Sequence, residues 1–96
     1  MNTITPTKHQ RIDLDQQQLD ALPEALQEYT ELEKISAYNN QIQLLPQWLF
    51  TLKNLKKINI SANPITHIPE AIGNLKNLNT FYIKEIHDFL KPAGRA

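Results

Sequence analysis

The residue types that most often carry out chemistry in proteins are few in this chain. The 3 histidines are His9, His67 and His87, which stand at unrelated positions, and the chain has no cysteine. A thiol nucleophile and a thiolate metal site are therefore excluded. With only 2 glycines, the sequence has no glycine-rich phosphate loop, and it has no cluster of metal ligands. We therefore expect no enzyme, no metal site and no cofactor.

The residues that do follow a pattern are prolines and aliphatic side chains. Prolines recur every 23 residues, at Pro23, Pro46, Pro69 and Pro92. Apolar residues recur with the same interval, first at Ile12, Ile35, Ile58 and Phe81, and two residues later at Leu14, Ala37, Ile60 and Ile83. A fixed interval of this length is typical of stacked repeat proteins, because each unit buries its apolar face against the next.

The spacing within each unit also resembles a known family. From Ile35 the unit reads I-S-A-Y-N-N-Q-I-Q-L-L-P-Q-W-L-F-T-L-K-N-L-K-K, and from Ile58 it reads I-N-I-S-A-N-P-I-T-H-I-P-E-A-I-G-N-L-K-N-L-N-T. Both resemble the leucine-rich repeat, in its 23-residue variant with the L-P-x-x-I/L-x-x-L return segment. The resemblance implies an α/β repeat fold. This would be a short solenoid with a parallel sheet of about four strands on the concave face and short helical or 3-10 turns on the convex face.

Each apolar–polar–apolar triplet is expected to be a short strand whose first and third side chains point inward and whose middle side chain points outward. Asn40 and Asn63 come five residues after the first apolar position of their units. The resemblance implies that these asparagines turn inward and hydrogen-bond the backbone of adjacent loops. Gln17 in the first unit and Ile86 in the fourth depart from this pattern.

The chain of 96 residues suits a single domain. We expect residues 1–10 to form an irregular N-terminal cap and residues 11–83 to form three full repeats plus a fourth strand. Residues 84–96 are expected to be a degenerate fourth repeat or a C-terminal capping helix and tail. So few repeats lie close to the minimum for a stable solenoid.

Charge and hydropathy restrict the classes of partner. Lys+Arg and Asp+Glu both number 10, so no net charge draws the chain to nucleic acid or to an acidic membrane. The start of the chain lacks the apolar run of a signal peptide, and no later stretch is apolar enough to span a membrane. We expect a cytoplasmic protein that binds neither nucleic acid nor membrane.

The outward side chains of the strands are the candidate binding residues. Arg11, Lys34 and Lys57 should lie side by side, and Tyr38 and Tyr82 offer large contact areas at low entropic cost. We expect this face to dock an extended or acidic surface of a protein or peptide partner. The residues chosen for this role are Lys34, Ser36, Tyr38, Lys57, Asn59, Ser61, Tyr82 and Lys84. The alternative is that these are merely solvated strand faces.

A second contact patch is conceivable on the convex side. Trp48 stands where other units have Ala25 and Ala71, and Phe50 where they have Gln27 and Gly73. These two aromatic side chains either pack over their small neighbours or form an apolar patch for association. Two further hypotheses about the function of the chain stay open. One is a weak homodimer formed through this patch or an uncapped end, and the other is the recognition segment of a larger enzyme or receptor.

Overall fold

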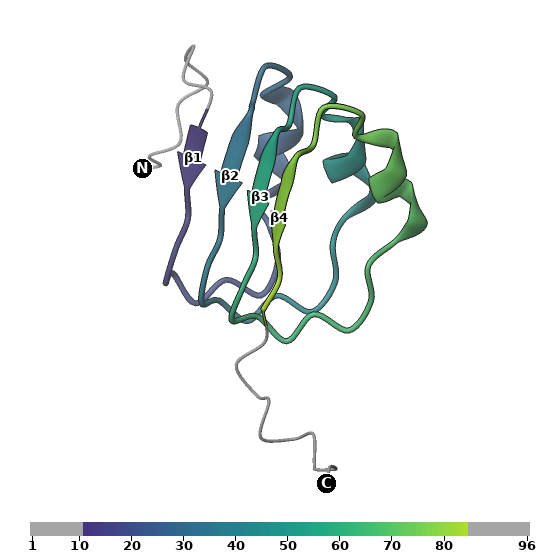
Figure 1. Cartoon of the computed structure of the whole chain (residues 1–96). Helices are drawn as coiled ribbons and strands as arrows, with labels where there is room; N and C mark the ends of the chain where they lie inside the picture. The colour runs from purple at the N-terminus through teal and green to yellow at the C-terminus, as the bar shows by residue number, and fades with distance from the viewer. Residues whose placement is uncertain (1–10, 85–96) are drawn as a thin grey trace, which may run out of the picture.

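The computed structural model describes residues 11–84 and shows one parallel sheet backed by short helices (Figure 1). The strands lie in the order β1-β2-β3-β4, with bounds β1 (Arg11–Asp13), β2 (Lys34–Ser36), β3 (Lys57–Asn59) and β4 (Thr80–Tyr82). The opposite side carries the 3-10 helices η1 (Glu24–Glu28), η2 (Gln47–Thr51) and η3 (Glu70–Asn74). This confirms the short α/β repeat solenoid expected from the sequence.

Several sequence expectations fall outside the described residues. They are the N-terminal cap of residues 1–10, and everything after Lys84 in the degenerate repeat or capping helix of residues 84–96. The departure at Ile86, the proline at Pro92 and the histidines His9 and His87 also belong to these segments.

The strands pair in the register that the repeat interval predicts. Ile12 of β1 lies beside Ile35 of β2, which lies beside Ile58 of β3. Phe81 of β4 continues the series beside Ile58. Residues 23 positions apart therefore become neighbours in space, and each outward side chain faces solvent beside its counterpart from the next unit.

The inward side chains form the core. Ile35 and Ala37 are buried around half-buried Ser36, and Ile58 and Ile60 repeat this arrangement in the next unit. The alternation is the one required by a strand that packs on one face and is solvated on the other.

Each helical turn begins directly after a proline. Pro23, Pro46 and Pro69 have extended backbone conformations and act as N-caps of η1, η2 and η3. Proline lacks an N–H group and has a fixed φ angle, so it suits this boundary. Glu24 and Glu70 are the first residues of η1 and η3, where a carboxylate interacts favourably with the exposed N–H groups.

Asn40 and Asn63 fill the inward role that the resemblance implied. The Asn40 side-chain oxygen accepts the backbone N–H groups of Gln17 (2.9 Å) and Leu19 (3.0 Å), and its amide group donates to the Leu14 carbonyl (2.9 Å). Asn63 accepts the N–H of Ile42 (3.0 Å) and donates to the carbonyl of Ala37 (2.8 Å) in the preceding unit. These bonds connect neighbouring units at the loops where the strand pairing has ended.

Phe50 favours packing over the alternative of an exposed convex patch. Its side chain is only 2% exposed and belongs to the core, while Trp48 is half-buried and packs against that core. Burial of an aromatic ring removes a large apolar area from water, and this favours packing over exposure. The large hydrophobic residue exposed nearby is instead Leu44, at 66%.

Candidate functional site

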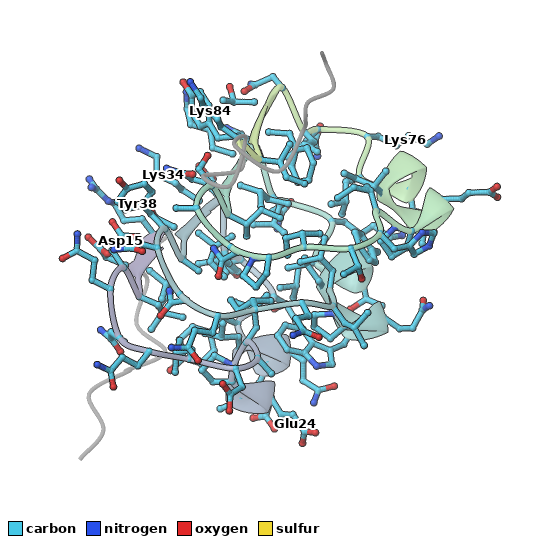
Figure 2. All side chains as sticks on the ribbon, turned by 90° about the horizontal axis from the view of Figure 1, so that it is seen from below. Asp15, Glu24, Lys34, Tyr38, Lys76 and Lys84 are labelled. Atoms are coloured by element: carbon cyan, nitrogen blue, oxygen red, sulfur yellow. The ribbon has the colours of Figure 1, made fainter. Side chains whose placement is uncertain are left out.

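The candidate residues gather on the outward side of the sheet, which we call the concave strand face. In Figure 2, Lys34, Tyr38 and Lys84 lie on one side of the molecule together with Asp15. Glu24 and Lys76 lie away from them, beside the helical turns. The strand register brings Ser36 beside Asn59, and Asn59 beside Tyr82. The structure therefore brings together on one face the residues selected from the sequence.

These residues differ in exposure. Tyr82 is 57% exposed and Tyr38 is 40% exposed, and Lys57 and Lys84 are exposed as well. The half-buried members are Lys34, Ser36, Asn59 and Ser61. Two exposed aromatic side chains therefore lie on a face whose other candidate residues are polar and in part half-buried.

Internal hydrogen bonds hold several polar side chains of this face in place. Asp15 accepts the hydroxyl of Ser36 (2.6 Å) and the backbone N–H of Tyr38 (2.8 Å) through its Oδ1 atom. Asn59 accepts the N–H of Ser61 at 3.0 Å. The Ser61 hydroxyl oxygen accepts the N–H of Lys84 at 3.2 Å. These contacts give Asp15, Ser36, Asn59 and Ser61 a structural role beside any role in binding.

A line of positive side chains crosses the first three strands. Arg11 of β1 pairs in register with Lys34 of β2, which pairs with Lys57 of β3. We call these three residues the basic row. They line a shallow depression of about 350 Å³ on the concave strand face, whose other lining residues are Asp13, Ile35, Ser36, Asn59 and Tyr82.

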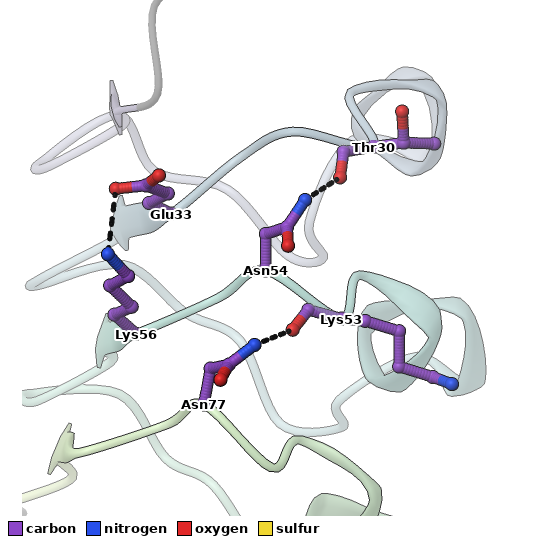
Figure 3. A network of polar contacts seen from close by, with 6 residues as sticks. All are labelled: Thr30, Glu33, Lys53, Asn54, Lys56 and Asn77. Atoms are coloured by element: carbon purple, nitrogen blue, oxygen red, sulfur yellow. Dashed lines mark hydrogen bonds and ion pairs between the residues drawn. The ribbon is translucent and has the colours of Figure 1, made fainter.

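A second depression, of about 200 Å³, lies on the other side of the basic row and is also lined by Glu33 and Lys56. The Lys56 ammonium lies 3.6 Å from the Glu33 carboxylate, as Figure 3 shows. Glu33 is thus paired with Lys56. Within residues 11–84, the structure contains no ion pair that involves the basic row.

A further set of polar contacts joins the loops that lead into the strands. Asn54 donates its side-chain amide to the carbonyl of Thr30 (3.1 Å), and Asn77 donates to that of Lys53 (3.0 Å) (Figure 3). Sequence reasoning missed both residues. The signal was present, because Asn54 and Asn77 hold the same position in successive units.

Histidine and acidic side chains in the described part of the chain do not gather into a metal site. His67 is exposed, and residues 11–84 contain no group of three or more His, Cys, Asp or Glu side chains arranged to hold a metal ion. In the same region, no helix is both long and apolar enough to cross a membrane. The arrangement is suited to contact with another molecule through a polar face.

Comparison with known protein families gives one match. A family model described as a leucine rich repeat matches residues 30–85, which is more than half of the chain. The comparison with curated proteins found no match.

Proposed function

The chain belongs to the leucine-rich repeat family, whose domains generally mediate protein–protein interactions, and on that premise we propose a non-catalytic module that binds a protein or peptide through its concave strand face. The family is typically an interaction module and not a catalytic one. The residues proposed to contact the partner are the eight selected from the sequence, with Tyr38 and Tyr82 as the main apolar contacts.

Finer points of the assignment are also proposals. We assign the repeats to the 23-residue variant with the L-P-x-x-I/L-x-x-L return segment, supported by the register of the strands and by the proline before each helical turn. We assign residues 11–83 to the repeat region and the cytoplasm as the location. Neither nucleic acid nor a membrane is proposed as a partner.

The observation that carries the proposal is the exposure of Tyr38 and Tyr82 on a face otherwise made of polar side chains. Neither ring packs into the core, although the fold buries most of its other large apolar side chains. Tyrosine at a surface contributes contact area and a hydroxyl group while losing little conformational entropy on binding. A solvated face with no binding role would need neither ring.

The size of the face limits the strength of the contact. Four strands about 4.8 Å apart make a sheet roughly 20 Å wide, which offers on the order of a few hundred Å². A standard interface buries roughly 800 Å² on each partner. We therefore expect a weak or transient complex unless the partner also contacts the loops.

The test is affinity capture from a lysate of the source cell with three forms of the chain. These are the wild type, a concave variant (Tyr38→Ala/Asn59→Arg/Tyr82→Ala) and a control variant of the helical side (Gln27→Arg/Lys76→Ala), all checked for equal folding by circular dichroism and thermal melting. We expect a protein that the wild type and the control retain and the concave variant loses. A protein that all three forms retain equally would contradict the assignment of the face.

A second candidate function is self-association through the C-terminal side of the described repeats. Leu55 and Ile58 are fully buried, whereas their counterparts Leu78 and Phe81 in the next unit are half-buried. An incompletely covered apolar side favours contact with another copy. This alternative predicts that the mass measured by light scattering rises with protein concentration. A constant monomer mass over the whole accessible concentration range would exclude it.

A further inference from the structure

We infer that the basic row recognises an extended acidic segment of the partner, with carboxylates at alternate residues, that runs across the sheet from β1 to β3. The inference rests on the proposed function, because it specifies the partner's chemistry for the same concave strand face.

The strands do not need the basic row. Arg11, Lys34 and Lys57 occupy directly paired positions on strands that lie about 4.8 Å apart, and like charges at paired positions destabilise a sheet. The fourth member of the row is Thr80, which pairs with Lys57 and carries no charge. The fold thus accepts a neutral, β-branched residue at this position, and the repeated positive charge calls for a reason other than stability.

No acidic side chain of residues 11–84 forms an ion pair with the row. Glu33 lies beside it but is paired with the Lys56 ammonium at 3.6 Å. Asp13 lines the larger depression of about 350 Å³, and its Oδ1 atom accepts the backbone N–H of Asp15 at 3.0 Å. The two depressions beside the row are lined by four cationic residues (Arg11, Lys34, Lys56 and Lys57) and two acidic residues (Asp13 and Glu33). This edge of the face therefore carries a net positive charge, which favours an anionic partner.

The shape beside the row suits an extended chain. The depression of about 350 Å³ has the basic row along one edge, with Asn59 and the exposed ring of Tyr82 among its other lining residues. In an extended peptide, alternate side chains point the same way and lie roughly 6.8 Å apart. The row spans roughly 10 Å from β1 to β3. Two carboxylates at alternate residues can therefore reach all three flexible cationic groups.

Asp13 gives the face a second sign. It follows Arg11 by two residues on β1, so both side chains point outward from the same strand. An acidic side chain of the partner would be repelled at this point. The segment that fits best carries its carboxylates opposite the basic row and a neutral or basic residue opposite Asp13.

The experiment uses the full chain and labelled synthetic peptides in fluorescence anisotropy. The probe has glutamates at alternate positions. One comparison peptide has the same number of glutamates in a consecutive block, and another has glutamine in place of each glutamate. We expect the alternating peptide to bind most tightly and the glutamine peptide least. We also expect the affinity to fall several-fold when the salt concentration is raised from about 0.05 M to about 0.5 M.

Two matched double variants separate position from overall charge. Lys34→Thr/Lys57→Thr gives two members of the basic row the residue found at Thr80, and Lys53→Thr/Lys76→Thr gives two lysines near the helical turns the residue found at Thr30. Both remove the same charge. We expect the first to weaken binding about tenfold and the second by no more than about twofold. Asp13→Asn should tighten binding of the alternating peptide by a few-fold.

Four results would overturn the inference. Equal weakening by the two double variants would mean that only net charge matters. Equal affinity for the alternating and consecutive peptides would remove the strand-crossing geometry. Competition by a short single-stranded oligonucleotide at the same concentration as the peptide would indicate a non-specific polyanion site. If the peptide fails to bind while the concave variant still loses its captured protein, the inference falls and the proposed function stands.

Discussion

The two sides of the same strands follow different rules. Inward, the residue type repeats from unit to unit, as with Ile35 and Ile58, because each position must fill the same space against its neighbours. Outward, the central position changes from Ser36 to Asn59 to Tyr82, although all three occupy paired positions. Packing explains why the inward residues repeat. The outward residues are free to vary, so they can be selected for contact with a partner. The basic row is the exception, because it repeats on the side where packing does not demand it.

The largest expected effect on stability is at Phe50, the aromatic residue whose side chain is buried in the core. Phe50→Ala should destabilise the fold by about 3–5 kcal/mol, because it removes a buried ring and leaves a cavity. Since this loss could unfold so small a protein, Phe50→Leu, expected to cost less than about 1.5 kcal/mol, provides a graded second variant. Urea denaturation followed by circular dichroism measures both. If Phe50→Ala melts like the wild type, the ring does not contribute to the packed core, and the assignment of Phe50 to the inner side is wrong.

Two asparagines on opposite sides of one unit should differ in how much they contribute to stability. Asn63→Ala should cost roughly 1–3 kcal/mol, because the N–H of Ile42 loses its buried acceptor and the carbonyl of Ala37 keeps only the donor from Asn40. Asn59→Ala should cost less than about 0.5 kcal/mol, because its partner, the N–H of Ser61, stays within reach of water. The same urea measurement decides, and equal costs would contradict the division between the two sides.

A backbone effect of intermediate size is expected just beyond β2. Asn39 has a φ angle of 61°, and Gln16 and Ala62, its counterparts in the neighbouring units, have 58° and 62°. Asparagine tolerates this left-handed conformation, whereas a β-branched residue does not. Asn39→Val should therefore lose about 1–2 kcal/mol, and Asn39→Gly should change stability little. Thermal melting of the two variants tests this, and equal melting temperatures would remove the role of the conformation.

The smallest expected effect on stability is at the basic row. Lys34→Thr/Lys57→Thr should change the free energy of unfolding by no more than about 0.5 kcal/mol, and toward greater stability, because paired like charges are removed. The Lys53→Thr/Lys76→Thr variant is the control in the same denaturation experiment. A loss of more than about 1 kcal/mol in the first variant alone would give the basic row a structural purpose.

Much of the fold could be predicted from the sequence because packing repeats. The interval of the prolines and of residues such as Ile35 and Ile58 fixes the strand register, and the inward Asn40 and Asn63 follow from the family pattern. The sequence left open whether Phe50 packs inward or lies at the surface, because its counterparts, Gln27 and Gly73, are not large apolar residues. Position within a repeat predicts the direction of the backbone. It does not predict how far a larger ring turns toward the core.

The sequence could predict which residues lie on the candidate face, but not their hydrogen bonds or their exposure. Repetition placed Lys34 beside Lys57, and the structure has that pairing. The bonds from Asp15 to Ser36 and Tyr38 depend on side-chain conformations, which no sequence interval specifies. For the same reason, the exposure of Leu44 came only from the structure. Whether the face binds a partner remains a prediction.

The most direct test of the proposed function is to map binding onto the two sides of the fold. The captured partner would be titrated into the isotope-labelled chain, and changes in the backbone amide signals would be followed by nuclear magnetic resonance. The account predicts that the largest changes lie in β2, β3 and β4 and in the residues just after them, with little change in η1, η2 and η3. Changes concentrated in the three helical turns would contradict it, and would move the interaction to the convex side.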